Sequence, residues 1–140
     1  MIYVEPRMVN RRWETCPIDI KPARWQSLYA SINARGAITI TQFTHLALGA
    51  PEAYVLLFER AKETIGLKPA RSGDKNAYPA VEFGRHGGRR IRGHRLLQEF
   101  GITVFETKRF RQCMLDQTGV LILDLRDTVP ATRKTKPRFR

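Results

Sequence analysis

The chain is poor in cysteine and has no long apolar run. Cys16 and Cys113 are its two cysteines, they lie far apart, and they form no C-x-x-C pair. Reduced, structural thiols in a cytosolic protein are the interpretation that this spacing favours. No run of apolar residues approaches the length of a transmembrane helix, and the first residues, MIYVEPRMVNRRW, contain no hydrophobic segment of a secretory signal. We therefore expect a cytoplasmic protein without a membrane partner.

Residues arranged for catalysis are also scarce. Asp and Glu together number thirteen, and no two of them have a spacing that indicates acid–base chemistry. The three histidines, His45, His86 and His94, share no metal-ligand spacing with one another or with Cys113. No phosphate-binding loop of the P-loop or dinucleotide type is present. We therefore predict no enzymatic activity, no metal and no cofactor.

Positive charge, in contrast, is abundant. Twenty-five Lys and Arg residues give a formal net charge of +12. Such a field attracts polyanions, and nucleic acid is the leading candidate because neutralising phosphates releases counterions. An anionic membrane is less favoured because no long basic amphipathic helix is visible. The alternative is that the arginines are solvated and only maintain solubility.

The stretch RGAITITQFTHLALGAPEAYVLLFERAKETIGLKPA, residues 35–70, indicates strand, short helix and hairpin. Ile38 and Ile40 alternate with threonines, as in a half-buried strand. A short helix follows and should end at Gly49. Two strands, 54–58 and 65–68, should form the hairpin. Upstream, residues 24–33 are compatible with helix or strand, and we favour a strand that pairs with 37–41.

These features resemble the AbrB/MazE-like swapped-hairpin family of transition-state regulators and antitoxin DNA-binding domains. The resemblance rests on R-G-x-I-x-I, a short helix ending in L-G, E-A-x-V-x-L and I-x-L-x-P. Members commonly carry Pro directly after the first strand, where this chain has Thr41. The resemblance implies a dimeric or pseudo-dimeric β-barrel that binds DNA through basic residues near the first strand and helix.

A similar order of elements follows a polar linker at residues 71–76. We expect strands at 77–85 and 89–92, a helix at 94–100, a long strand at 103–115, a turn at 116–119 and a strand at 120–125. Gly36 and Gly49 are thirteen residues apart, as are Gly88 and Gly101. This spacing suggests an internal duplication of a β-β-α-β-β unit, in which each copy covers the apolar face of the other. Chance occurrence of two glycine-terminated helices is the alternative.

The segment GRHGGRRIRGHR, which begins at Gly84, is the sharpest feature of the sequence. Glycine allows a phosphate to approach the backbone closely, and arginine supplies bidentate contacts to phosphate or guanine. Clustered like charge disfavours folding by self-repulsion, so an anionic partner explains it best. The candidate nucleic-acid-binding residues of the folded part are Arg35, Arg85, Arg89, Arg90, Arg92, Arg95, Lys108, Arg109 and Arg111. Lys108 and Arg109 cannot face the same way on a regular strand.

Both ends of the chain differ from its middle. Residues 1–22 form an irregular, proline-interrupted arm, and residues 128–140 a basic tail expected to be disordered. The tail adds the candidate phosphate contacts Arg133, Lys134, Lys136 and Arg138, unless it is simply solvated.

The prediction is an α+β, mostly β protein with one barrel-like domain at 23–127, built from halves 23–70 and 77–127 as a swapped-hairpin-like barrel. Its predicted function is that of a double-stranded DNA-binding transcriptional regulator or antitoxin-like factor, with DNA favoured over RNA and a homodimer or larger assembly as a further partner. The alternative is a non-enzymatic accessory or structural subunit of a nucleic-acid-containing assembly, such as a ribosome-associated or defence complex.

Overall fold

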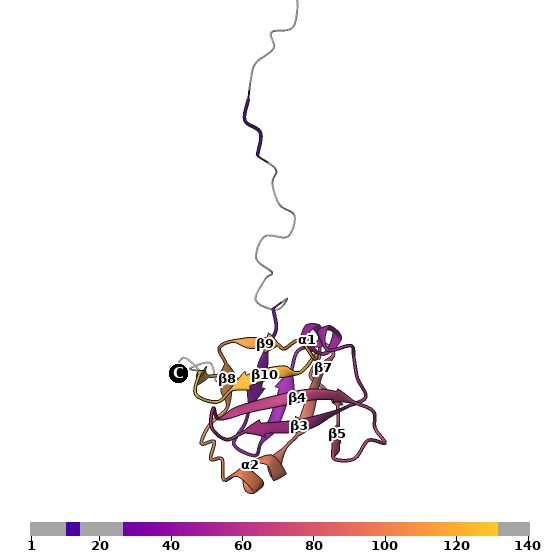
Figure 1. The fold of residues 1–140 in the computed structure, drawn as a ribbon, viewed down its shortest axis with the longest axis vertical. Coiled ribbons are helices and arrows are strands. Elements are labelled where there is room, and N and C mark those ends of the chain that lie inside the picture. The colour runs from indigo at the N-terminus through magenta and orange to yellow at the C-terminus, as the bar shows by residue number, and fades with distance from the viewer. Residues whose placement is uncertain (1–10, 15–26, 132–140) are drawn as a thin grey trace, which may run out of the picture.

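Two antiparallel sheets form the body of the computed structural model, which describes residues 11–14 and 27–131 (Figure 1). Sheet A has the strand order β11-β8-β1-β2-β7-β6, and sheet B the order β5-β3-β4-β10-β9. The elements are β1 Ala30–Ile32, β2 Ala37–Ile40, α1 Gln42–Ala47, β3 Ala53–Glu59, β4 Thr64–Ala70, β5 Ala77–Pro79, β6 Val81–Phe83, β7 Gly88–Arg92, α2 His94–Phe100, β8 Lys108–Phe110, β9 Cys113–Leu115, β10 Leu121–Asp124 and β11 Thr128–Pro130. The mostly β class is therefore confirmed.

The hydrophobic core lies between the two sheets. Sheet A contributes Ile32, Ile38 and Ile91, and sheet B contributes Tyr54 and Leu123, all fully buried. In each strand these residues alternate with residues on the outer face, because successive side chains of a strand point to opposite sides. Each sheet thus has one face in the core and one face turned away from it.

The first half of the chain folds largely as its sequence predicts. The pairing of β1 with β2 is confirmed, and the Asn33 side-chain oxygen accepts hydrogen bonds from the backbone N–H groups of Arg35 and Ala37 in the connecting turn. Thr41 caps α1 by accepting from the Thr44 backbone N–H. Gly49 follows the helix with a φ of 88°, in the left-handed region predicted for it.

The prediction that the sheets form a barrel is wrong. Sheet A ends at β11 and β6, and sheet B at β5 and β9, so neither sheet closes on itself. Two expected strands are each broken into strands of different sheets. Residues 77–85 divide into β5 and β6 around Pro79 and Ala80, where the Ala80 backbone N–H donates to the Glu52 carbonyl. Residues 103–115 contain β8 and β9, and the chain turns between them where the Arg111 backbone N–H donates to the Asp127 carbonyl.

Other boundaries in the second half agree with expectation or shift slightly. The helix at 94–100 and its end at Gly101, which has a φ of 64°, are confirmed. The expected disorder from residue 128 is wrong at its start, since β11 pairs with β8 and extends sheet A to Pro130. The internal duplication and the hairpin swap are not confirmed. Residues 1–10, 15–26 and 132–140, which include most of the predicted arm and tail, lie outside the described residues.

Candidate nucleic-acid interface

The outer face of sheet A carries a row of directly paired residues that crosses all six strands. Directly paired residues of antiparallel strands share a face. The row runs Val129, Arg109, Ser31, Thr39, Arg90 and Val81. Arg109 and Arg90 are separated by two strands, which corresponds to about 14 Å at the usual ~4.8 Å strand spacing. Two predicted site residues from distant parts of the sequence therefore lie on one surface.

Arg92 extends this surface. It lies two residues after Arg90 on β7, so it faces the same way, and its side chain is exposed. Its direct partner on β2 is Ala37, whose small side chain does not cover it. Among the strand residues of sheet A the only carboxylate is Glu82, which pairs with Arg89 and so belongs to the opposite face. The surface formed by Arg90, Arg92, Arg109 and Thr39 is called the basic face below; Ser31 belongs to the same row but is buried.

Arg90 is held in place by uncharged groups. Its guanidinium carbon lies 3.6 Å from the centroid of the Phe83 ring, and its Nε donates to Thr39 Oγ1 at 3.3 Å. Among the described residues no carboxylate forms an ion pair with it. Its charge is consequently positioned but not neutralised. Sequence reasoning missed Phe83 and Thr39, since only the pairing of β6, β7 and β2 brings them to Arg90.

Arg89 belongs to a different environment. Its Nη1 donates to the carbonyl oxygens of Gly87 and Gly88 at 2.7 and 3.0 Å, which fixes the turn before β7. It is also close to His45, whose pKa is lowered first by burial and second by the positive charge of Arg89. The imidazole Nδ1 shares a 2.8 Å hydrogen bond with the buried Tyr54 hydroxyl. Arg89 therefore supports the turn before β7 and lies on the side of that strand opposite Arg90, so it is not part of the basic face.

Lys108 is likewise turned away from the basic face. It pairs with Ile32, whereas Arg109 pairs with Ser31, so the two side chains face opposite sides as strand alternation requires. Its Nζ forms an ion pair with Glu106 at 3.2 Å and lines a cavity of about 380 Å³ between the sheets. Arg60, the other lysine or arginine of that cavity, stacks on Phe100. Lys108 and Arg60 thus interact with Glu106 and Phe100, respectively. Neither side chain is arranged as a free positive charge for an anion in this cavity.

Three further predicted residues, Arg111, Arg35 and Arg95, lie outside the strands that form the basic face. Arg111 forms an ion pair with Asp127 at 3.6 Å, which offsets part of its charge. Arg35 is exposed in the β1–β2 turn, next to Gly36, whose carbonyl accepts from the Gly93 backbone N–H. Arg95 is exposed on α2. The tail residues Arg133, Lys134, Lys136 and Arg138 lie outside the described residues.

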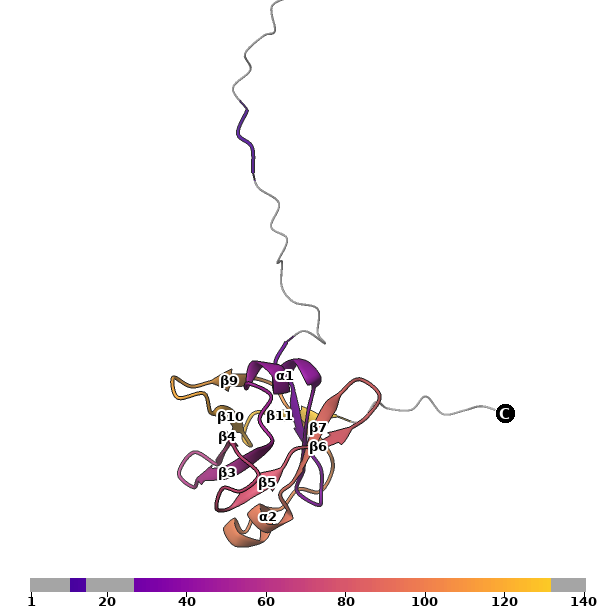
Figure 2. The same cartoon turned by 90° about the vertical axis from the view of Figure 1, so that its right-hand side faces the viewer.

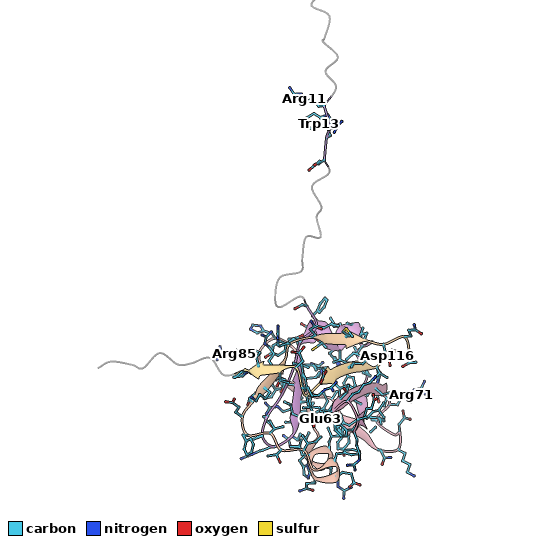
Figure 3. All side chains as sticks on the ribbon, turned by 60° about the vertical axis from the view of Figure 1, so that its left-hand side comes forward. Arg11, Trp13, Glu63, Arg71, Arg85 and Asp116 are labelled. Carbon is cyan, nitrogen blue, oxygen red and sulfur yellow. The ribbon has the colours of Figure 1, made fainter. Side chains whose placement is uncertain are left out.

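The β6–β7 hairpin projects from the edge of sheet A as a two-stranded ribbon (Figure 2). All three residues of β6 are exposed, and β7 provides its connection to the sheet. Gly84 and Gly87, with φ values of 83° and 73°, shape the tip and hold the exposed Arg85 between them. Figure 3 shows Arg85 at the margin of the molecule, on the side away from Asp116.

Three further features of the described residues bear on metal binding, thiol reactivity and membrane insertion. Residues 11–14 and 27–131 contain no group of three His, Cys, Asp or Glu side chains that could hold a metal ion. Burial raises the pKa of the Cys113 thiol to about 11, so it is protonated at neutral pH and a poor nucleophile. No described helix is long and apolar enough to span a membrane.

The sequence matches no known protein family and no curated protein, and the structure matches no solved structure.

Proposed function

We propose that the protein binds nucleic acid, and duplex DNA in preference to RNA, through the basic face of sheet A. The observation that carries this proposal is the alignment of Arg90, Arg92 and Arg109 on one face of sheet A, while Glu82, the carboxylate of these strands, lies on the opposite face. Phosphate contacts supply most of the affinity for nucleic acid and fix the position of the protein without reading sequence. The three arginines have this role.

The projecting ribbon supports duplex DNA as the preferred form. The major groove of B-DNA admits a two-stranded β-ribbon, whereas the major groove of duplex RNA is too narrow for side chains to read. Arg85 at the tip would then reach base edges while the basic face contacts the flanking phosphates. The resemblance of residues 35–70 to swapped-hairpin DNA-binding domains points the same way and favours a role as a transcriptional regulator or antitoxin-like factor.

A comparison of charge removal on two surfaces tests this proposal. Replacing Arg92 and Arg109 with Gln should weaken duplex binding and lower the slope of log K against log salt by about 1.8, since each phosphate contact contributes about 0.9. Arg60→Gln with Arg126→Gln removes the same charge outside sheet A and is the matched control. An equal loss of affinity in both variants would show that net charge, not this face, drives binding.

The predicted alternative, a subunit of a nucleic-acid-containing assembly, would use the same basic face. Selection of DNA ligands from a random duplex pool separates the two functions. A defined, preferred sequence supports the regulator, and recovery of no preferred sequence supports the assembly subunit.

A further inference from the structure

Two apolar side chains are exposed on the outer side of the projecting β6–β7 hairpin. Val81 and Phe83 are 46% and 41% exposed. They lie two residues apart on β6, so both point to the same side of the strand. Val81 pairs directly with Arg90 on β7. The two apolar side chains therefore belong to the same side of sheet A as the basic face.

The Phe83 ring is held in one orientation by its neighbour. The guanidinium carbon of Arg90 lies 3.6 Å from the ring centroid, so the guanidinium covers one side of the ring. The Nε atom of Arg90 donates to Thr39 Oγ1, which fixes the guanidinium in turn. The uncovered part of the ring thus forms, together with Val81, a fixed apolar surface beside a cation.

The charge around this apolar pair decides from which side a polyanion approaches. Arg90 and Arg92 lie on the same side of the hairpin as the pair, whereas Glu82 lies on the opposite side. Directly opposite residues of antiparallel strands have Cβ atoms about 5 Å apart. A duplex that contacts Arg90 therefore also covers Val81 and the neighbouring Phe83.

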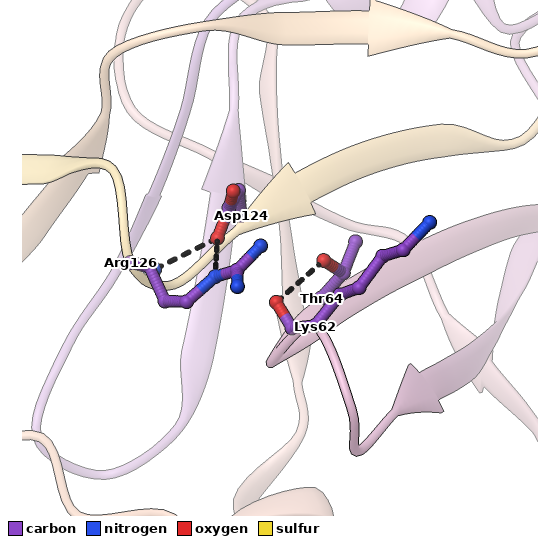
Figure 4. A network of polar contacts seen from close by, with 4 residues as sticks. All are labelled: Lys62, Thr64, Asp124 and Arg126. Atoms are coloured by element: carbon purple, nitrogen blue, oxygen red, sulfur yellow. Dashed lines mark hydrogen bonds and ion pairs between the residues drawn. The ribbon is translucent and has the colours of Figure 1, made fainter.

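The exposed apolar side chains of sheet B lie in a different environment. Leu57 and Met114 are 42% and 57% exposed, and they line an open groove together with carboxylates that include Asp116 and Asp124. Asp124 accepts hydrogen bonds from the Arg126 backbone N–H at 2.9 Å and from Arg126 Nε at 3.3 Å (Figure 4). These carboxylates disfavour the approach of DNA, so sheet B offers apolar positions that serve as controls.

The major groove of DNA presents one apolar recognition group, the C5-methyl group of thymine, and its other recognition groups are hydrogen-bond donors and acceptors. If Val81 or Phe83 covers those donors and acceptors, they lose water without gaining a hydrogen bond, which costs free energy. A thymine at the same position offers a methyl group whose burial is favourable. Contact with the apolar pair would therefore favour thymine over the other bases.

We propose, building on the proposed binding of duplex DNA, that Val81 and Phe83 each contact the C5-methyl group of a thymine in the major groove. Arg90 and Arg92 contact the flanking phosphates. The two apolar residues are about 6.8 Å apart along β6, at a rise of ~3.4 Å per residue. Successive bases of one DNA strand are about 3.4 Å apart along the helix axis. With the hairpin lying along the groove, the preferred site therefore contains two thymines separated by two base steps.

Replacement of thymine by deoxyuridine tests this contact, because it removes the C5-methyl group and keeps the base pair. A duplex of high affinity is first selected from a random pool, and each of its thymines is then replaced singly. At two thymines, separated by two base steps, we expect a loss of affinity of about fourfold each, the effect of burying one CH₂-sized group. Fluorescence anisotropy of the labelled duplexes measures the ratio of the two affinities.

Variants of the protein assign each methyl group to a side chain. In Val81→Ala the ratio of thymine to deoxyuridine affinity should fall to about 1 at one position and remain about 4 at the other. Phe83→Ala should give the reverse pattern. Each ratio is measured within one variant, so a general loss of affinity from the broken Arg90 stack cancels. Leu57→Ala, a similarly exposed apolar position on sheet B, is the matched control and should keep both ratios.

The outcomes separate this contact from nucleic-acid binding in general. Salt-sensitive duplex binding with equal affinity for thymine and deoxyuridine at every position, or a selected pool without enriched thymine, would overturn the contact and leave nucleic-acid binding intact. The absence of any duplex binding would overturn both. Ratios that persist in Val81→Ala and Phe83→Ala would show that other side chains read the methyl groups, against the proposal. Binding to vesicles of phosphatidylserine and phosphatidylcholine that requires the apolar pair, without any effect of thymine methyl groups, would assign the pair to a membrane surface instead.

Discussion

The guanidinium of Arg90 stacks on the ring of Phe83, with 3.6 Å between its central carbon and the ring centroid. The two residues lie on neighbouring strands of the projecting ribbon, and Thr39 on β2 accepts a hydrogen bond from Arg90 Nε. An aromatic ring fixes the direction of the guanidinium without cancelling its charge. The ribbon thus presents a preorganised cation beside an exposed apolar edge.

Phe83→Leu should weaken duplex binding because Leu keeps apolar contact but removes the cation–π interaction. The stack contributes about 0.5 to 2 kcal/mol, so we expect a loss of affinity of about 2- to 30-fold. Fluorescence anisotropy with a labelled duplex measures this. Val81→Leu, on the same strand and face, is the control and should bind as the wild type. Unchanged affinity in Phe83→Leu would mean that the stack does not prepare Arg90 for a ligand.

Arg89 and Arg92 should respond differently to replacement by Ala, although they are three residues apart on the same strand. Arg92→Ala should reduce affinity and leave the unfolding midpoint unchanged, because its side chain is exposed and forms no ion pair within the described part of the chain. Arg89→Ala should lower stability by about 1 to 3 kcal/mol, because the Gly87 and Gly88 carbonyls lose a charged donor. Urea unfolding and anisotropy on both variants separate these effects. A large loss of affinity in Arg89→Ala with full stability would return Arg89 to the contact surface.

Gly36→Ala should destabilise the fold far more than Gly49→Ala. Both glycines have a positive φ, of 85° and 88°, so each substitution introduces strain of about 1 to 2 kcal/mol. Only at Gly36 would the new Cβ also lie 2.9 Å from Gly93 O, His94 Cα and Leu97 Cγ, whereas nothing lies within 4 Å at Gly49. We expect at least about 1 kcal/mol of additional loss at Gly36 from displaced packing. Equal urea midpoints for the two variants would contradict the close approach of β1–β2 to α2.

Stability should fall when the pH drops below about 6.5, the ordinary pKa of histidine. Burial, reinforced by Arg89, lowers the pKa of His45 in the folded state. The unfolded chain therefore binds a proton that the folded chain resists, and stability is fully present above pH 6.5 and lost as the pH falls toward the folded value. His45→Gln keeps a hydrogen-bonding side chain that does not titrate. The dependence of its urea midpoint on pH between about 5 and 7 should be flatter than in the wild type.

The local elements of this chain were largely predictable from sequence. Glycines after the two helices, the threonine alternation of β2 and the turn built on Asp116 are signals within a few residues of one another. The Asp116 Oδ1 atom indeed accepts from the backbone N–H groups of Thr118 and Val120. Such contacts join residues that are close in the sequence, so a local sequence pattern can predict them.

The arrangement of the sheets was not predictable in the same way. The division of residues 103–115 between β8 and β9 depends on β11 pairing with β8 and on the Arg111 backbone meeting Asp127. Both are long-range contacts that no local pattern reveals. The same limit applies to the candidate site. The run GRRIR identifies a basic strand, but the pairing of β7 with β2 and β6 decides that Arg90 meets Phe83 while Arg89 turns toward His45.

Replacement of Arg85 tests whether the tip of the β6–β7 hairpin distinguishes one DNA sequence from another. If the ribbon enters the major groove, Arg85→Ala should relax the preference for one selected duplex over another, by about 1 to 3 kcal/mol if the contact to guanine is bidentate. Arg109→Ala should instead weaken binding to all duplexes alike. Competition with selected and scrambled duplexes measures both effects. A uniform loss in Arg85→Ala would assign the ribbon tip to the phosphate backbone.

The most direct test of the central claim is binding of the purified full chain to duplex DNA, duplex RNA and single strands at two salt concentrations. We expect tight binding at low salt, a steep loss at high salt and a preference for duplex DNA. No binding to any of these nucleic acids at low salt would contradict it, and the basic face would then require an acidic protein as its partner.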